Sequence, residues 1–276
     1  MDGPHPFTGH QKLGVVFQPD DCSFPLETSS DCLTGIGAAK EPTASVNYRG
    51  ADSFVVYTWL DCGLVGMGQG ANAVEELKQR TRRAHENNVQ TVVENVFWTG
   101  GSFATSQYLA ADTPISETVG GSIVNLQTAA NIITGTYDIT KAISLLEGAM
   151  ATCYGGVPLI HVPREVTPFL ANAHLIKEAG SLIKTTGNNS IIVPGPGYPG
   201  TGPDGEAPDA NTTWIYATGS VKMWRSEPFF TAHNAGELLL RDVNDTVEIL
   251  EQRFMFGWDC CHFAIQVALP NTTIEP

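Results

Sequence analysis

The last third of the chain decides the fold, because apolar strands alternate there with one proline-started helix and a loop rich in glycine and proline. Residues 159–165 read Leu-Ile-His-Val-Pro-Arg-Glu and predict a strand that runs directly into a helix. Residues 214–221 read Trp-Ile-Tyr-Ala-Thr-Gly-Ser-Val and predict two strands with a break between them. Residues 246–259 lead into a final apolar strand. The region is rich in regular structure and holds no convergent set of catalytic side chains.

Outward from this region the pattern is a mixture of helices and strands. Helices are expected at residues 71–88, 123–133, 139–152 and 164–179, with Asp138 as an N-cap and Pro163 at a first helical position. Strands are expected at residues 46–48, 54–60, 91–97, 159–162, 190–193, 213–217, 219–225, 246–256 and 260–268, with a hairpin turn at 49–53. Residues 1–45 show no sustained period and predict an extended arm. The fold class is therefore α+β.

Composition favours an oligomer. The 276 residues suffice for one large domain or two small ones, and charged residues make up only 16% of them, against about 25% in a typical domain. A net charge of −14 argues against binding nucleic acid through a basic surface, although an acidic wall can still enclose a polyanion. The one basic cluster, at Lys78, Arg80, Arg82 and Arg83, is either the solvated face of a helix or a local contact to a neighbour or DNA.

The six cysteines are expected to be free thiols in a reducing cytosol. They are Cys22, Cys32, Cys62, Cys153, Cys260 and Cys261, and no C-x-x-C pair or histidine pair accompanies them, so a zinc site is poorly supported. Cys260 and Cys261 are adjacent on an expected strand and would point to opposite faces. The first residues carry no secretory signal pattern, and no apolar run of about 18 residues suggests a membrane span. We expect the chain to fold in a cytoplasm.

The segment from Gly66 to Ala71 is the strongest sign of an enzyme. It fits G-x-G-x-x-A between a strand and a helix, and Glu94 would end the next strand, as in a dinucleotide-binding fold. The preceding strand, however, breaks at residues 61–63, and the further β-α units do not follow. A glycine hinge between a hairpin and a helix explains the segment better, and a nucleotide-dependent oxidoreductase remains the less favoured alternative.

The other residues that could carry chemistry lack partners at a suitable spacing in the sequence. The loop at residues 195–205 lacks the Gly-Lys-Ser/Thr ending of a phosphate cradle, so it is expected at the surface or in a subunit contact. His161 and His262 are placed on strands and His174 on a helix, without a nucleophile at readable spacing. Asp259, Cys260 and His262 are neighbours on a strand and diverge in direction. We therefore predict no catalytic, cofactor-binding or metal-binding residue, no cofactor and no enzyme activity.

The order of these pieces resembles the major capsid proteins of tailed bacteriophages, which have the Hong Kong 97-type fold that encapsulins share. The matching pieces are residues 159–164, 191–193, 214–224, 245–249 and 253–256. Residues 217–221 and 258–261 also look like segments in head proteins of phages that infect actinobacteria. The resemblance covers most of residues 138–269, is weaker before them, and rests on spacing without one diagnostic motif.

This resemblance implies a division of the chain. It would consist of an N-terminal arm (1–45), an extended hairpin loop (46–70), a spine helix with peripheral domain (71–137), an axial domain (138–225) and return strands (226–276). It also implies a structural protein that self-assembles as pentamers and hexamers into an icosahedral head around double-stranded DNA. Flexing at residues 63–70 would fit one chain to non-identical environments. An N-terminal scaffolding segment looks absent, which leaves a separate scaffolding protein, or none.

Several alternatives stay open beside this implication. The chain could be an encapsulin-type compartment shell or a minor head or neck protein. Portal and decoration proteins are possible partners, and no membrane is expected. Some family members join a lysine to an asparagine of a neighbour, but nothing identifies such a pair here, and we predict no cross-link through Lys40 or Lys184. Large aromatic side chains could be interface anchors or ordinary core: Trp59, Trp98, Trp214, Trp224, Trp258, Phe229 and Phe230.

Overall fold

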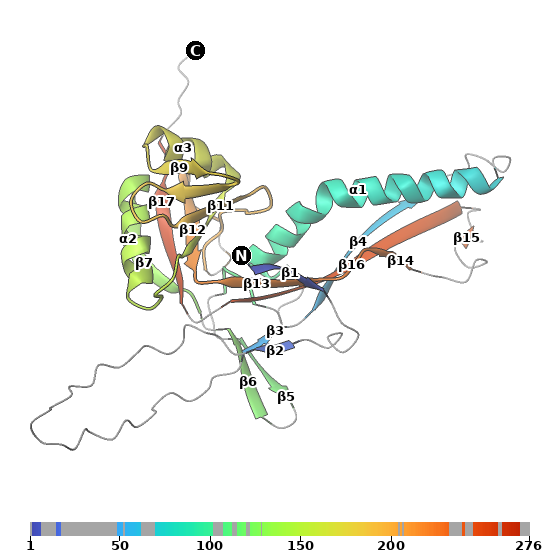
Figure 1. Ribbon diagram of the computed structural model, residues 1–276, viewed down its shortest axis with the longest axis horizontal. Coiled ribbons are helices and arrows are strands. Elements are labelled where there is room, and N and C mark those ends of the chain that lie inside the picture. The colour runs from blue at the N-terminus through green and yellow to red at the C-terminus, as the bar shows by residue number, and fades with distance from the viewer. Residues whose placement is uncertain are drawn as a thin grey trace, which may run out of the picture.

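The structure is a computed structural model, and it describes residues 2–6, 15–17, 49–51, 53–61, 70–101, 107–111, 115–119, 122–127, 129–203, 205, 207–231, 239–240, 245–258 and 261–270. These residues form two main parts, at the left and right of Figure 1. We call the compact part, a seven-stranded sheet with helices α2 and α3, the body. We call the elongated part, helix α1 with strands β4, β14 and β16, the wing.

The body is built on a sheet with the order β7-β17-β12-β8-β11-β10-β9. Its strands are β7 (Asn131–Tyr137), β8 (Leu159–Pro163), β9 (Ile176–Ala179), β10 (Leu182–Thr185), β11 (Ile191–Gly195), β12 (Thr212–Thr218) and β17 (His262–Ala268). The central strand β8 is buried at all five positions, so both of its faces meet other parts of the molecule.

Two helices cover one face of this sheet. They are α2 (Ile139–Ala151) and α3 (Thr167–Asn172), the latter preceded by the 3-10 helix η2 (Arg164–Val166). The Asp138 carboxylate accepts hydrogen bonds from the backbone N–H groups of Thr140 and Lys141, each at 3.0 Å, and so caps α2 as expected. The buried residues of α2 form one face of the helix, which packs against the sheet: Ile139, Ala142, Ile143, Leu146 and Met150.

The wing is organised by β16 (Asp245–Trp258), a strand of 14 residues. Its sheet also contains β1 (Asp2–Pro6), β4 (Phe54–Asp61), β13 (Val221–Arg225), β14 (Phe229–Phe230) and β15 (Leu239–Leu240). Helix α1 (Gly70–Thr99) is 30 residues long and runs along one side of β4 and β16 before it reaches the body (Figure 1). Phe97 and Trp98, near the end of α1, are buried in a core that also receives Tyr216 and Ala264 from the body sheet.

A third sheet lies below the other two in Figure 1. Its order is β2-β3-β6-β5, from β2 (Val15–Phe17), β3 (Arg49–Ala51), β6 (Ser122–Gln127) and β5 (Ile115–Val119). Of the expected N-terminal arm, residues 1–45, the structure describes strands β1 and β2. Strand β1 pairs in parallel with β13, and β2 pairs antiparallel with β3.

The expected strands of the last third are confirmed as β8, β11, β12, β13, β16 and β17. The strand expected at residues 54–60 is confirmed as β4, but the hairpin turn expected at residues 49–53 is wrong. Residues 46–48 lie outside the described residues, and residues 49–51, expected in the turn, form β3. Strand β4 pairs with β16 instead, because this register places the Phe54 ring 5.9 Å from the Phe254 ring and 5.5 Å from the Phe256 ring.

Residues 91–97 form the end of α1 and not a strand. Their β-branched residues suggested a strand, yet Val89, Val93 and Phe97 follow one another at intervals of four residues. All three pack on the same core, with Val93 and Phe97 buried. Tertiary packing of a helical stripe therefore overrides the weak local preference.

Residues 123–127 belong to strand β6 and residues 131–133 to strand β7, so the helix expected at residues 123–133 is wrong. The helix expected at residues 164–179 is also too long. Pro168 lies in the first turn of α3, which ends at Asn172, and His174 then adopts a left-handed φ of 55°. Residues 176–179 form β9, which returns through Gly180, at φ 66°, into β10. This positive φ marks a hairpin turn that suits glycine.

Candidate assembly surface

A chain of polar side chains runs through the interior of the wing. The Thr58 hydroxyl of β4 and His85 Nδ1 of α1 are 3.0 Å apart, and His85 Nε2 lies 3.2 Å from Gln252 Oε1 of β16. The Gln252 amide donates in turn to the Ser226 carbonyl at 2.7 Å. Because Gln252 Oε1 can only accept, His85 Nε2 carries the proton and Nδ1 accepts from Thr58. Strands β4 and β16, helix α1 and the segment that follows β13 are thus joined by directed bonds.

The other face of the wing sheet carries exposed aromatic side chains. Thr58 faces α1, so its neighbours on β4, Tyr57 and Trp59, point away from the helix. They are 63% and 54% exposed. Phe229 of β14 is 39% exposed and lies opposite Glu251, which also lies opposite Tyr57. Opposite residues of paired strands share a face, so these three rings form one apolar face, which we call the aromatic face.

The aromatic residues singled out from the sequence thus divide into buried core residues and exposed residues. Trp98 and Trp258 are core residues with at most 1% exposure, and Trp224 is also buried. Trp59 and Phe229 lie on the aromatic face, where an interface anchor would be. The sequence had not singled out Tyr57, although its alternation with Phe54 and Val56 marks a strand that is apolar on both faces.

The basic residues lie on the opposite layer of the wing. Arg80, Arg82 and Arg83 are exposed on α1, in agreement with a solvated helix face. The Lys78 ammonium and the Arg82 guanidinium each lie 5.8 Å from the centre of the Phe230 ring on β14. These two cations thus help to hold α1 on the sheet. Contact of this cluster with a neighbour or with DNA stays a prediction.

The glycine- and proline-rich loop after β11 joins the body to α1. Glu94 accepts hydrogen bonds from the Gly197 backbone N–H at 2.9 Å and from the Gln90 amide at 2.8 Å. The Trp98 indole N–H reaches the Thr201 carbonyl at 3.1 Å. A Cβ at position 197 would collide with the Thr91 carbonyl, so the loop needs glycine there. Gly197 and Tyr198 are buried, and the expectation of a surface loop is wrong for this part.

Burial dominates the acid–base properties of this junction. Desolvation raises the pKa of Glu94, while its bonds to Gly197 and Gln90 and the charge of Arg164 lower it. Glu94 is also the acidic residue of the dinucleotide-binding alternative, which placed it at the end of a strand. It lies within α1, so that β-α-β unit does not form; residues 66–69 of the glycine segment lie outside the described residues.

The histidines are placed as structural groups. His161 is fully buried on β8, where its Nε2 is 2.9 Å from the Thr218 hydroxyl and its Nδ1 is 3.3 Å from the Tyr198 hydroxyl. Burial, and secondarily the nearby His262, lowers the pKa of His161 to about 3. Burial also raises the pKa of Tyr198. A neutral histidine between two hydroxyls fixes strand positions and is closed to solvent.

The remaining candidate catalytic side chains do not form a common site among the described residues. His262 is buried on β17 as expected, with its ring stacked on Tyr216 at a centroid distance of 5.8 Å. His174 follows the end of α3 and is not on a helix, because that helix is shorter than expected. Asp259 and Cys260 lie outside the described residues. Among the described residues, no group of three or more His, Cys, Asp or Glu side chains could hold a metal ion.

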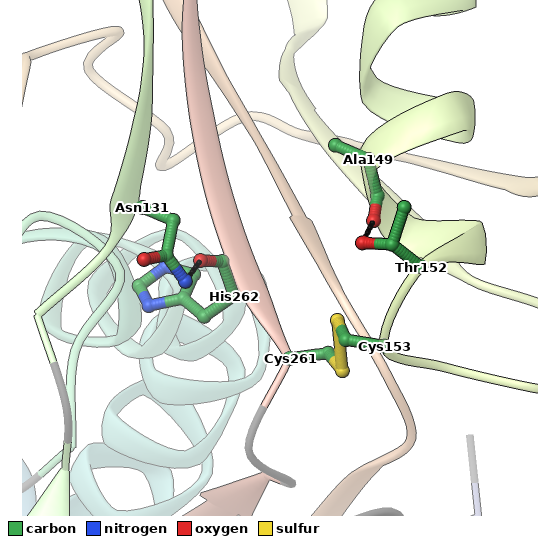
Figure 2. Close-up of a disulfide and its surroundings, with 6 residues drawn as sticks. All are labelled: Asn131, Ala149, Thr152, Cys153, Cys261 and His262. Atoms are coloured by element: carbon green, nitrogen blue, oxygen red, sulfur yellow. Dashed lines mark hydrogen bonds between the residues drawn. A yellow bond between two sulfur atoms is a disulfide. The ribbon is translucent and has the colours of Figure 1, made fainter. Parts of the chain in front are cut away.

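Cys153 and Cys261 form a disulfide, so the expectation of free thiols is wrong for this pair (Figure 2). They are separated by 108 residues in sequence, but the end of α2 and the start of β17 bring their Cα atoms to 5.9 Å. Sequence spacing gave no signal of this approach, which depends on the packing of α2 against the sheet. Cys22, Cys32, Cys62 and Cys260 lie outside the described residues.

Comparison with known proteins identifies the fold. No protein-family model and no curated protein matches the sequence. Among solved structures, a chain of the capsid of a native GTA particle aligns with a TM-score of 0.50 and 9% identity, over 93% of this chain and 84% of that chain. The chain has the Hong Kong 97-type capsid fold.

Two other solved structures align at similar levels. Gordonia phage Cozz gives a TM-score of 0.49 and 11% identity, over 93% of this chain and 81% of that chain. The SrpI encapsulin from Synechococcus elongatus PCC 7942 gives a TM-score of 0.48 and 10% identity, over 82% of this chain and 78% of that chain. The capsid fold agrees with the expected α+β class. Within the described residues, no helix is both long and apolar enough to cross a bilayer.

Proposed function

We propose that this protein is the major capsid protein of a tailed bacteriophage. Copies of the chain would assemble as pentamers and hexamers into an icosahedral head that encloses double-stranded DNA, and the chain would have no enzyme activity. The observation that supports this best is the capsid fold, which is shared with a capsid chain over 93% of this chain's length. The virion is then the place of the mature protein, after assembly in the host cytoplasm.

The two-part architecture suits a shell subunit. A body whose central strand β8 is buried on both faces gives a firm unit around which five or six copies can meet. A thin wing with exposed aromatic side chains on one face offers surface to a neighbouring copy. The net charge of −14 would keep packaged DNA from adhering to the wall through a basic field.

The roles of the segments belong to the same proposal. Residues 1–45 would act as the N-terminal arm, 46–70 as the extended loop, 71–137 as spine helix and peripheral domain, 138–225 as axial domain and 226–276 as return strands. The close packing of α1 on β4 and β16 supports a spine with a peripheral sheet. Portal, scaffolding and decoration proteins would be the other partners.

Electron microscopy of the purified full chain tests the proposal. We expect closed particles or ring-shaped capsomers, and sedimentation of most of the protein far faster than a 29.6 kDa monomer. A chain that stays monomeric at high concentration would contradict it. Particle contents then separate the shell classes, since a phage head is expected with DNA and an encapsulin-type compartment with a cargo protein. About a dozen copies per virion, instead of hundreds, would indicate a neck protein.

A further inference from the structure

The disulfide between Cys153 and Cys261 lies where the chain passes between the body and the wing. Residues 218–221 connect β12 of the body to β13 of the wing sheet, and residues 258–262 connect β16 of the wing to β17 of the body. The ends of these two connections are paired antiparallel on both the body side and the wing side. We call the two connections together the crossover. Because Cys261 belongs to it, the disulfide ties the crossover to the end of α2 (Figure 2).

Cys261 links both connections of the crossover to the body. Its carbonyl accepts a hydrogen bond from the Gly219 N–H at 3.3 Å, which is longer than the usual range that ends at about 3.2 Å. Its sulfur is bonded to Cys153, which directly follows Thr152, the C-cap residue of α2. One connection is therefore held to α2 covalently, and the other through a weak bond to the same residue.

The two sulfur atoms differ in their access to solvent. Cys261 is 3% exposed and belongs to the aliphatic core on the α2 side of the sheet. Cys153 is half-buried, and residues 151–152 and 155–157 on either side of it are exposed. Thiol–disulfide exchange requires that a thiolate reach one of the two sulfur atoms. A reagent from solvent therefore reaches the bond at Cys153 and not at Cys261.

We infer that Cys153 and Cys261 form a redox-controlled clamp on the crossover. In the reducing cytoplasm of a host both residues are thiols, and noncovalent contacts alone hold the crossover to α2. In an oxidising medium the disulfide closes and fixes the crossover to α2. The inference rests on the proposed function, because a virion protein folds inside a cell and later leaves it.

The oxidant is a small-molecule disulfide of the class of oxidised glutathione. The Cys153 thiol loses its proton to solvent, and its thiolate attacks one sulfur of the oxidant, which releases one small thiolate and leaves a mixed disulfide on Cys153. Cys261 then loses its proton, and its thiolate attacks the Cys153 sulfur and releases the second small thiolate. The two small thiolates take up the two protons. Two protein thiols are thus oxidised, and one small disulfide is reduced to two thiols.

Thiol trapping in cells that produce the full chain tests when the clamp closes. The cells are quenched in acid, and free thiols are alkylated in denaturant before the protein meets air. We expect mass spectrometry to find Cys153 and Cys261 alkylated in most of the chain from cells, and joined in most of the purified chain after incubation with oxidised glutathione. A bond that is already closed in the cells would overturn the inference, and so would a pair that oxidised glutathione leaves as thiols.

Hydrogen exchange of unassembled subunits tests what the clamp holds. After reduction we expect exchange in peptides that contain residues 218–221 and 258–262 to become about fivefold faster or more, because the crossover opens locally. Exchange of residues 54–61 in β4 should stay the same, which distinguishes local opening from global unfolding. Equal exchange of the crossover in reduced and oxidised subunits would overturn the inference.

Two variants provide matched controls. Cys153→Ser cannot form the bond, so its crossover should exchange as in the reduced wild type, with and without oxidant. Cys260→Ser removes the cysteine next to Cys261 in sequence and should respond to oxidant as the wild type does. Loss of that response would overturn the inference. Subunits that never assemble would contradict the proposed function alone, because trapping and exchange do not require assembled particles.

Discussion

The body and the wing bury their residues in different ways. The body places a sheet between two layers, and its core on the α2 side consists of fully buried aliphatic side chains such as Leu146, Ile160 and Ile215. The wing has one helix on one face of a sheet, and its interior includes Thr81, His85 and Gln252 beside Leu77. The body is therefore stabilised mainly by aliphatic burial, whereas the wing combines an aromatic core around Phe54 and Phe254 with directed hydrogen bonds.

This difference implies that the two parts differ in stability before assembly. A core closed on both faces has its full stability in the isolated subunit, whereas a two-layer wing with exposed rings gains stability when a partner covers it. We therefore expect the wing to open locally at a lower free energy than the body in unassembled subunits. Four predictions follow for such subunits, in order of decreasing effect.

The same substitution in the two parts should have unequal effects. Leu146→Ala in the body is expected to lower the free energy of unfolding by about 4 kcal/mol, because the closed core cannot collapse around the cavity. Leu77→Ala in the wing is expected to cost about 2 kcal/mol, since the thin layer can relax toward solvent. Urea unfolding measures both values. Equal losses would contradict the division between body and wing.

The disulfide should stabilise the protein against global unfolding without changing local opening of the wing, because both cysteines lie in the body. Cys153→Ser is expected to lower the free energy of unfolding by about 3 kcal/mol, because the bond constrains a 108-residue segment of the unfolded chain. The reduced wild-type protein should fall to the same value, and the variant should not respond to reductant. Hydrogen exchange within the wing should remain unchanged. A wing that loosens as much as the body would show that the two parts unfold as one unit.

Acid should weaken the junction between the two parts. The folded pKa of His161 is about 3 and its ordinary value 6.5, so the unfolded chain binds a proton that the folded chain refuses between these values. Stability is therefore lost as the pH falls below 6.5, by about 2 kcal/mol between pH 7 and pH 5. His161→Gln should lose that much less over the same range in urea unfolding. The pKa of Glu94 shifts upward and acts in the opposite direction, but it is present in both proteins.

A parallel pH response of the two proteins would show that His161 is not the responsible group. In that case protonation of His161 would not weaken the junction, and the wing would still be the first part of the subunit to open in acid.

The smallest effect is expected at the start of α2. Asp138→Ala removes the acceptor for two backbone N–H groups and should cost about 1 kcal/mol, measured by thermal unfolding. Asp138→Asn is the matched control, because asparagine caps equally well. A loss in the asparagine variant as large as in the alanine variant would indicate that the charge, and not the cap, matters.

Much of the body could be predicted from the sequence, because its signals are local. Asp138 marks the start of α2. The apolar runs at β8, β12 and β17 are short and rich in β-branched and aromatic residues, and they predict strands without knowledge of their packing partners. The capsid fold followed from the order of these pieces. Residues 91–97 and 123–133 were assigned the opposite secondary structure, since β-branched residues and short apolar runs do not decide between helix and strand without their packing partners.

Only part of the candidate assembly surface could be predicted from the sequence. Trp59 and Phe229 were recognised as possible anchors, but nothing local separates them from Trp98 and Trp258, which are buried. Their exposure depends on which face of the sheet α1 covers, and that is set by the pairing of β4 with β16, residues almost two hundred positions apart. The disulfide was missed for the same reason, as its partners meet only after the body has folded.

The bond between Cys153 and Cys261 has a consequence for proteolysis. It ties together two points between which lie β8 to β16, including the loop after β11. A protease that cuts once within this span leaves two polypeptides that are still covalently joined. On a gel without reductant such a nicked subunit migrates near its full mass, and it separates into two fragments only after reduction. A nick outside the span releases its fragment under either condition.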